Sequence, residues 1–206
     1  MLLLDHLRTE HELIERAVGS LQAFAASAVQ TPADRESYLR FFRLYAGRFH
    51  HAREEDSLFP ALVRETAAPA DRGPLKMLLE AHHAMAHLLD RMAAAQGADL
   101  SAVAGRYGSA LLHHIDAENS VLFPEAATRL GRAGVRELPD RAPDAEESAA
   151  RDAMEPMLVK YPPREIPDLI RGDGCVSCEA YGSGCDGVER EWWTELEWED
   201  VFHRIG

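Results

Sequence analysis

The sequence predicts an all-α protein: an up-down-up-down antiparallel four-helix bundle with an irregular C-terminal extension. Three observations indicate this fold class. Apolar residues recur at steps of three and four along four long segments, which is typical of helices that bury one face. Short stretches with helix-stop and helix-start residues separate these segments. Beyond Gly131 the periodicity ends and Pro, Gly and charged residues dominate, so we expect the bundle over residues 1–131 and the extension over 132–206.

The expected helices follow from the apolar pattern and its interruptions. In chain order they span about residues 2–29, 32–65, 74–95 and 99–131. Thr31 is a favourable N-cap and Pro32 suits the first turn of the second helix, and the segment APADRGP separates the second helix from the third. Because the connections are short, consecutive helices should run antiparallel. Pro60 and Pro124 lack a backbone donor, so the second and fourth helices should kink or end there.

The charge of the chain is negative and unevenly distributed. Of the formal net charge of −13, the segment 140–206 carries −10, from 17 Asp and Glu against 7 Lys and Arg. Such a surface repels phosphate, which makes nucleic acid and anionic membranes poor partners. The apolar start MLLL is interrupted at once by Asp5 and His6, and no stretch approaches the roughly eighteen apolar residues of a membrane helix. We therefore expect a cytoplasmic protein. Within the extension we expect one short helix near residues 143–154.

One motif occurs twice, as FHHAREEDSLFP in the second helix and HHIDAENSVLFP in the fourth. Alignment of the two Leu-Phe-Pro triplets, at an offset of 64 residues, matches His50 and Glu54 with His114 and Glu118. In each pair the carboxylate follows the histidine by four residues, so that both side chains lie on one helix face, one turn apart. The repeat therefore indicates that two helices present a histidine and a carboxylate to the same layer of the bundle.

The first copy allows a second alignment, in which His51 and Glu55 replace His50 and Glu54. The apolar positions of the second helix, Leu39, Phe42, Ala46 and Phe49, lead to His50. We therefore expect His50 to point inward, and His51 to lie at the surface or beside the ligands. The neighbours His83 and His113 are expected in the same kind of position.

The first and third helices each place one histidine in the apolar seam, His11 and His82. Six polar side chains then converge where apolar ones belong: His11, His50, Glu54, His82, His114 and Glu118. Two buried carboxylates need cations, and no Lys or Arg lies on these seams to supply them. Imidazoles together with carboxylates able to bridge suit a pair of borderline divalent metals. The sequence therefore predicts a dinuclear metal site.

These motifs resemble those of hemerythrin-type proteins of the HHE cation-binding family, over about residues 1–130. The matching words are TEHEL around His11, the two Leu-Phe-Pro motifs, and EAHHAM around His82. The resemblance implies two non-haem iron ions, bridged by Glu54, Glu118 and an oxo or hydroxo group. It also implies a small diatomic ligand or peroxide as partner, because members bind O₂ reversibly, sense O₂ or iron, or handle nitric oxide and peroxide.

The sequence departs from the oxygen-carrier pattern in its third helix. Carriers place H-x3-H there and use five histidines in all, whereas His82 is followed four residues on by Ala86. The four remaining histidines, two bridging carboxylates and one bridging oxygen would give each iron five ligands and leave both irons open. His87 is a further candidate ligand, although it lies five residues beyond His82 and off the seam.

The extension carries a second motif, CVSCEAYGSGC, with all three cysteines of the chain. Cys175, Cys178 and Cys185 could bind zinc, with His203 as the fourth ligand. A redox-active pair and three reduced thiols without a role are the other two interpretations. Three tryptophans near the C-terminus either pack on the bundle or mark a partner surface.

Two classes of function stay open from the sequence. One is an enzyme-like di-iron centre that reacts with O₂, peroxide or nitric oxide, as in stress defence. The other is a sensor or metal-binding module that signals to a protein partner through the C-terminal tail. Whether the protein is an enzyme, and its oligomeric state, do not follow from the residues.

Overall fold

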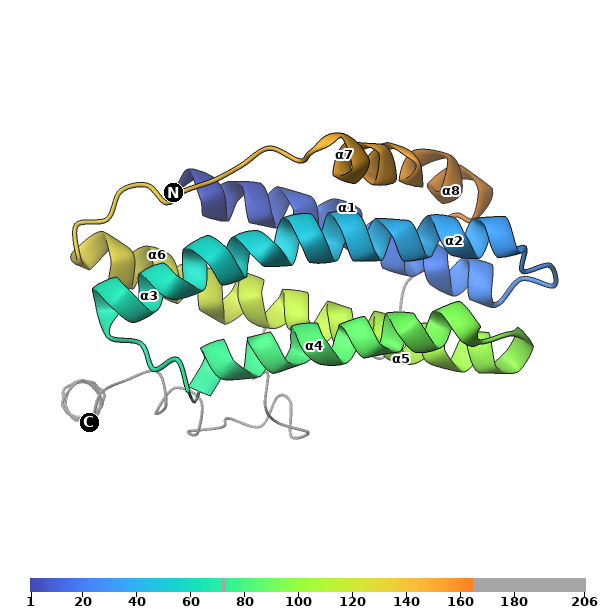
Figure 1. Ribbon diagram of the computed structural model, residues 1–206, viewed down its shortest axis with the longest axis horizontal. Coiled ribbons are helices and arrows are strands. Elements are labelled where there is room, and N and C mark those ends of the chain that lie inside the picture. Colours follow the sequence, from blue (N-terminus) through green and yellow to red (C-terminus); the bar gives the residue numbers. More distant parts are fainter. Residues whose placement is uncertain (72, 165–206) are drawn as a thin grey trace.

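The computed structural model describes residues 1–71 and 73–164 and has the predicted four-helix bundle (Figure 1). These residues contain helices and no strand. In chain order the bundle elements are α1 (Leu2–Ala25), α2 (Pro32–Arg40), η1 (Phe41–His51), η2 (Glu54–Leu58), α3 (Phe59–Thr66), α4 (Gly73–Ala94), α5 (Gly97–Ala117), η3 (Glu118–Leu122) and α6 (Phe123–Arg132). The second bundle helix runs without a break from α2 to α3, and the fourth from α5 to α6. Consecutive helices run up and down, as predicted.

The helix boundaries agree with the sequence prediction except at the end of the first helix. Thr31 caps α2, because its side chain accepts a hydrogen bond of 3.1 Å from the backbone N–H of Asp34. The first helix was expected to reach residue 29, but α1 ends at Ala25. Ser27 bends the chain there, donating its hydroxyl to the carbonyl of Val29, a local bond that competes with helix continuation.

Two of the bundle helices contain π-helical segments, which the apolar pattern of the sequence did not predict. These segments are η1, η2 and η3. The N–H of Phe59 donates to the carbonyl of Glu54, and the N–H of Phe123 donates to that of Glu118. A wider turn therefore precedes each Leu-Phe-Pro proline, and the helix continues instead of ending at Pro60 or Pro124.

A layer of polar side chains divides the bundle core into two apolar clusters. One cluster fills the part of the bundle around Ile14, Phe42, Met85 and Tyr107. The other surrounds residues nearer the opposite end, Leu4, Leu62, Leu78 and Leu130 among them. The histidines and glutamates of the predicted metal site separate the two clusters in every bundle helix.

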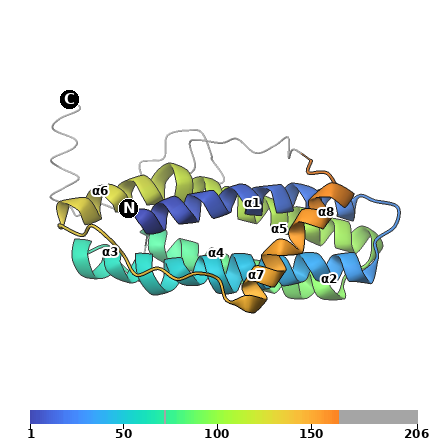
Figure 2. The same ribbon diagram turned by 90° about the horizontal axis from the view of Figure 1, so that it is seen from above.

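The described part of the predicted extension packs on the bundle. Residues 133–144 run along it as a strap, and α7 (Ala145–Asp152) and α8 (Met154–Lys160) follow (Figure 2). One helix was expected near 143–154, so α8 is an addition. It contributes Met154, Met157 and Leu158 to the core cluster around Ile14.

After α8 the chain crosses α1 at a glycine. The N–H of Arg164 donates to the carbonyl of Gly19 at 3.1 Å. A Cβ at Gly19 would lie 2.7 Å from the carbonyl oxygen of Arg164, so only glycine permits this approach. The three cysteines, His203 and the tryptophans lie outside the described residues.

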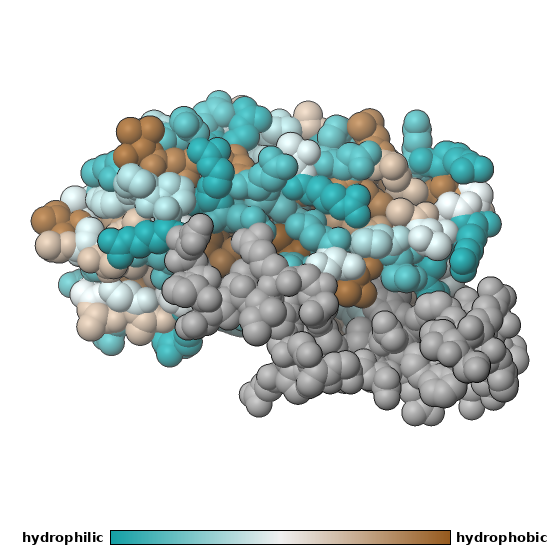
Figure 3. Space-filling view, turned by 180° about the vertical axis from the view of Figure 1, so that it is seen from behind, coloured by the Kyte–Doolittle hydropathy of each residue, from teal (hydrophilic) through white to brown (hydrophobic). Residues whose placement is uncertain are grey.

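Among the coloured residues visible in Figure 3, hydrophilic side chains predominate and apolar ones are scattered between them. The exposed large apolar side chains of the described residues are Leu2, Val29, Val63 and Val159. None of the described helices has the length and apolar character that crossing a membrane requires.

Candidate metal centre

The six residues predicted as metal ligands lie together in the middle layer of the bundle, and all are buried. Their imidazoles form two pairs, each from two helices. The Nε2 atoms of His11 and His50 lie 2.9 Å apart, as do those of His82 and His114. Each pair therefore directs two ring nitrogens at one place, which is the arrangement of two ligands of one cation.

Each of the two glutamates reaches both histidine pairs. Glu54 places Oε1 3.5 Å from Nε2 of His50 and Oε2 3.6 Å from Nε2 of His82. Glu118 places Oε2 3.3 Å from Nε2 of His11 and Oε1 3.1 Å from Nε2 of His114. One carboxylate oxygen of each glutamate thus faces each pair, so both carboxylates are placed to bridge two ions.

The four carboxylate oxygens of Glu54 and Glu118 are buried and accept no hydrogen bond within the described residues. Burial, with the neighbouring Glu118 carboxylate, raises the pKa of Glu54 well above its usual range. Burial also acts to raise the pKa of Glu118, but His114 and His11 hold it well below the usual range. Two such carboxylates can both be ionised only if cations compensate them, so the residues present fit a pair of metal ions.

Hydrogen bonds at the far side of three imidazoles fix which nitrogen carries the proton. The Nδ1 atom of His50 lies 2.8 Å from a carboxylate oxygen of Glu10, and that of His82 lies 2.7 Å from Glu55. Because a carboxylate only accepts, each Nδ1–H donates and Nε2 keeps its lone pair for a metal. Burial lowers the pKa of His50 to about 4, against the opposing effect of Glu10, so this ring is neutral at neutral pH.

In the pair formed by His11 and His50, these hydrogen bonds leave both Nε2 atoms unprotonated. Nδ1 of His11 lies 3.0 Å from the side-chain oxygen of Asn119, which likewise places the proton of His11 on Nδ1. Two unprotonated Nε2 atoms then face each other at 2.9 Å. Such a contact is no hydrogen bond, because neither atom carries a hydrogen, and it becomes favourable when a cation binds both lone pairs.

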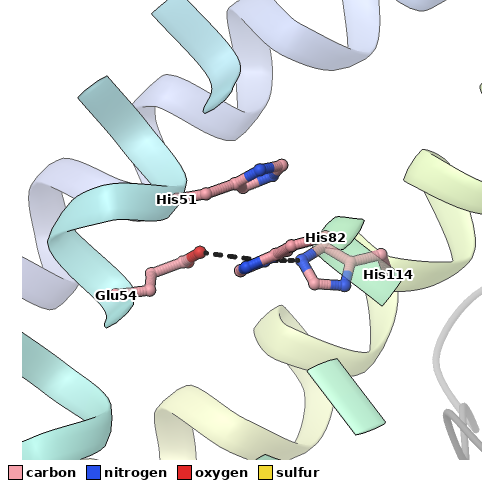
Figure 4. A group of neighbouring side chains, drawn as sticks. All are labelled: His51, Glu54, His82 and His114. Atoms are coloured by element: carbon pink, nitrogen blue, oxygen red, sulfur yellow. Dashed lines mark hydrogen bonds and ion pairs between the residues drawn. The ribbon is translucent and has the colours of Figure 1, made fainter. Parts of the chain in front are cut away.

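The sequence left two places open for His51, at the surface or beside the predicted ligands. The structure places it inside the bundle, beside them. It is 7% exposed, and its ring stacks on that of His82 at 3.9 Å. It belongs with Glu54, His82 and His114 to a group whose potential ligand atoms all lie within 4.8 Å of one another (Figure 4). His11, His50, Glu54 and Glu118 form the second such group.

The remaining histidines of residues 1–71 and 73–164 lie outside the cluster. His87, the further candidate ligand, is exposed on α4, and so are His83 on the same helix and His113 on α5. His6 is exposed and contacts Asp140 at 2.7 Å. Within the described residues, the fifth buried histidine is therefore His51 rather than His87.

The Leu-Phe-Pro triplets now have a structural explanation. Leu58 and Leu122 are buried in the apolar cluster beside the site. Phe59 stacks on His82 with ring centroids 6.2 Å apart, and Phe123 stacks on His11 at 5.6 Å. Each triplet thus packs its aromatic ring on the histidine of a neighbouring helix, closing one side of the polar layer with apolar groups.

A chain of polar contacts runs from the site to the strap. Arg53, 3% exposed, contacts Glu10, the carboxylate that holds His50. It also donates to Asp140 at 2.8 Å, and its guanidinium lies 4.0 Å from the centre of the Phe49 ring. The strap therefore touches the residues that orient His50, one of the predicted ligands.

Sequence reasoning considered His51 and Glu55 only as an alternative to His50 and Glu54, and it missed the hydrogen-bonding roles of Glu10, Glu55, Asn119 and Arg53. A usable signal existed for two of them: Glu55 and Asn119 directly follow Glu54 and Glu118 and are equivalent under the 64-residue offset. His51 was passed over because an α-helical period was assumed for η1. A π turn holds more residues than an α turn, so neighbouring residues point in more similar directions, and both His50 and His51 face inward.

Comparison with protein families matches residues 2–126 to the hemerythrin HHE cation binding domain. Searches of curated proteins and of solved structures gave no significant match. The matched segment includes both groups of histidines and glutamates that could hold a metal. It also covers more than half of the 206 residues. The chain therefore belongs to the hemerythrin HHE cation-binding domain family.

Proposed function

We propose that the protein is a non-haem di-iron protein that binds O₂, peroxide or nitric oxide and reacts with it, in a role such as stress defence. The observation that carries the proposal is the placement of Glu54 and Glu118. Each directs one oxygen to His11 and His50 and the other to His82 and His114, which suits two ions sharing two carboxylates. Mixed imidazole and carboxylate ligands suit iron among the borderline metals.

In such a centre, different groups of residues have different roles. Glu10, Glu55 and Asn119 hold the Nδ1 protons of three ligands, so that the Nε2 lone pairs point inward. Phe59 and Phe123 cover the layer from one side and limit water. Bound iron supplies Lewis acidity and electrons for reaction with a small molecule.

A specific observation also favours a sensor as the alternative function. The contacts from His50 through Glu10 and Arg53 to Asp140 link the centre to the strap that leads to the C-terminal region. A change in the position of His50 would alter the anchoring of that strap. In a sensor, occupancy of the centre would therefore change how accessible the region after residue 132 is to a partner.

Iron stoichiometry tests the di-iron proposal. Protein loaded anaerobically with ferrous iron should hold two ions per chain. Glu118→Ala should release both, because it removes a shared ligand, whereas His83→Ala, an exposed histidine on α4, should retain two. One iron in the unaltered protein, or full loading of the Glu118 variant, would contradict the proposal.

Reactivity separates the two functions. For the reactive centre, the diferrous protein should consume O₂, hydrogen peroxide or nitric oxide over repeated turnovers. For the sensor, those additions should change the rate of proteolysis after residue 132 without sustained turnover. The Asp140→Asn variant is the control for the sensor, because it should weaken the link from Arg53 to the strap and reduce that response.

A further inference from the structure

His51 is the one buried histidine of the described residues that the six-residue site leaves unused. Its Nε2 is buried and has no hydrogen-bond partner there. Figure 4 shows the ring beside that of His82, on the side of the cluster formed by Glu54, His82 and His114. A buried nitrogen without a partner is unfavourable, and a metal ion is the partner that this group of ligand atoms can hold.

The two halves of the bundle differ at this position. The 64-residue offset that equates His50 with His114 and Glu54 with Glu118 equates His51 with Ile115. Ile115 is 1% exposed and belongs to an apolar cluster. One half of the duplicated motif therefore carries an imidazole where the other carries a hydrocarbon side chain, so the two halves offer unequal numbers of potential donor atoms.

Resting on the proposed di-iron function, we propose that His51 is the fifth imidazole ligand. It would bind the ion held by His82 and His114. With the two bridging carboxylates and the bridging oxygen that the family resemblance implies, that ion has six ligands. The ion held by His11 and His50 has five and keeps the open position, so a small molecule binds there. The third imidazole nitrogen of the six-coordinate ion then comes from the second bundle helix instead of from His87 on α4.

For His51 to bind this ion, its imidazole ring must rotate. The rings of His51 and His82 are nearly parallel, at 10°, and a metal lies close to the plane of each imidazole that binds it. The His51 ring must therefore turn out of this stack to share an ion with His82. The rotation gives up a single ring stack, whereas a metal–imidazole bond supplies the missing partner of Nε2.

The coordination number of each iron tests the proposal. Near-infrared magnetic circular dichroism of the diferrous protein distinguishes six-coordinate from five-coordinate ferrous ions by the splitting of their ligand-field bands. The unaltered protein should show one ion of each kind and bind one azide per chain. His51→Leu should convert the six-coordinate ion into a second five-coordinate one. It should also weaken binding of the iron held by His82 and His114 by about tenfold or more, since loss of an outer hydrogen-bond partner alone can have an effect of that size.

Three further variants separate ligation from packing. His51→Phe keeps a ring that can stack on His82 and should behave like His51→Leu, whereas a return to the original spectrum would assign His51 a packing role and overturn the proposal. His87→Leu should leave the spectrum unchanged. Ile115→His supplies an imidazole at the equivalent position and should make both ions six-coordinate and abolish azide binding.

The result can be told apart from failure of the di-iron proposal. Two irons per chain with an unchanged spectrum in His51→Leu would overturn the role of His51 and leave the di-iron function standing. The same holds if His87→Leu, and not His51→Leu, removes the six-coordinate signal. A single iron in the unaltered protein would refute the di-iron function itself. If His51→Leu proves unfolded by circular dichroism, His51→Phe decides, and an unchanged six-coordinate signal in that variant overturns the role of His51.

Discussion

At the scale of single residues, the site depends on which nitrogen of each histidine is protonated. The carboxylate of Glu10 accepts a hydrogen bond from Nδ1–H of His50, and Arg53 holds Glu10 in place. Outer partners of this kind orient a ligand ring and raise its basicity. We therefore expect Glu10 to influence metal affinity without touching the ion.

We predict that Glu10→Gln lowers iron affinity at the His11/His50 position by about 10- to 100-fold. An amide can donate to Nδ1 as well as accept from it, so the ring is no longer held with a free Nε2 lone pair. Competition titration with a metal chelator measures the change. Glu12→Gln is the control, because Glu12 is exposed on the same helix, and equal affinity of the two variants would contradict the role of Glu10.

The sequence indicated six of the buried polar residues because each lies on an apolar seam of α-helical period. It did not indicate His51 as a ligand, since that period fails within η1, where hydrogen bonds span five residues. The single histidines His11 and His82 could be identified only by their seam position. Glu10 could not be identified, because its role depends on the distance between two helices that are far apart in sequence.

At the scale of helices, the four main elements follow from their apolar periodicity, whereas α7 is held by charge. Arg141 donates to both carboxylate oxygens of Glu147, at 2.7 and 2.9 Å, and Arg48 contacts the same side chain at 3.2 Å. Glu147 also completes the capping box with Asp144 at the start of α7. The sequence predicted a short helix near residues 143–154, but the prediction identified neither this cap nor the partner arginine in η1.

The charge of Glu147 predicts a pH dependence. Its hydrogen bonds with Arg141 lower its pKa to about 2, so the ionised form stabilises the folded state above the ordinary pKa of about 4.5. This contribution disappears as pH falls from about 4.5 to about 2. Because Arg141 is partly exposed, we expect about 2 kcal/mol at neutral pH.

Denaturant unfolding of Glu147→Gln beside the unaltered protein measures this contribution. The difference in free energy of unfolding should be largest at neutral pH and should vanish near pH 2. Glu155→Gln is the control, since Glu155 is exposed and lies 3.9 Å from Arg16. A difference that stays constant with pH would exclude the ionised carboxylate as its cause.

At the scale of the whole molecule, the bundle and the segment after it share one core. Met154, Met157 and Leu158 of α8 lie in the same apolar cluster as Phe24 and Tyr38. The hydroxyl of Ser20 on α1 donates to the carbonyl of Tyr161 at 2.7 Å. The sequence marked a boundary near residue 131 because the long helical period stops there, but loss of periodicity does not reveal where a short helix packs.

A chain that ends at residue 131 should therefore be less stable than one that ends at residue 164. Removal of the three buried side chains of α8 uncovers the bundle surface against which they pack, and it should lower the free energy of unfolding by about 3 to 5 kcal/mol. Urea unfolding of the two chains gives the difference. Equal midpoints would mean that α8 contributes nothing to the stability of the bundle.

The polar layer between the two apolar clusters has a consequence for how the molecule opens. Every bundle helix crosses from one cluster to the other through this layer, where side chains repel one another unless a cation joins them. Without metal, we expect the two ends of the bundle to behave as separate folding units, which fray independently and exchange their amide hydrogens at different rates. Ions shared by four helices should act as internal cross-links, so we expect metal loading to join both ends into one cooperative unit with a common exchange rate.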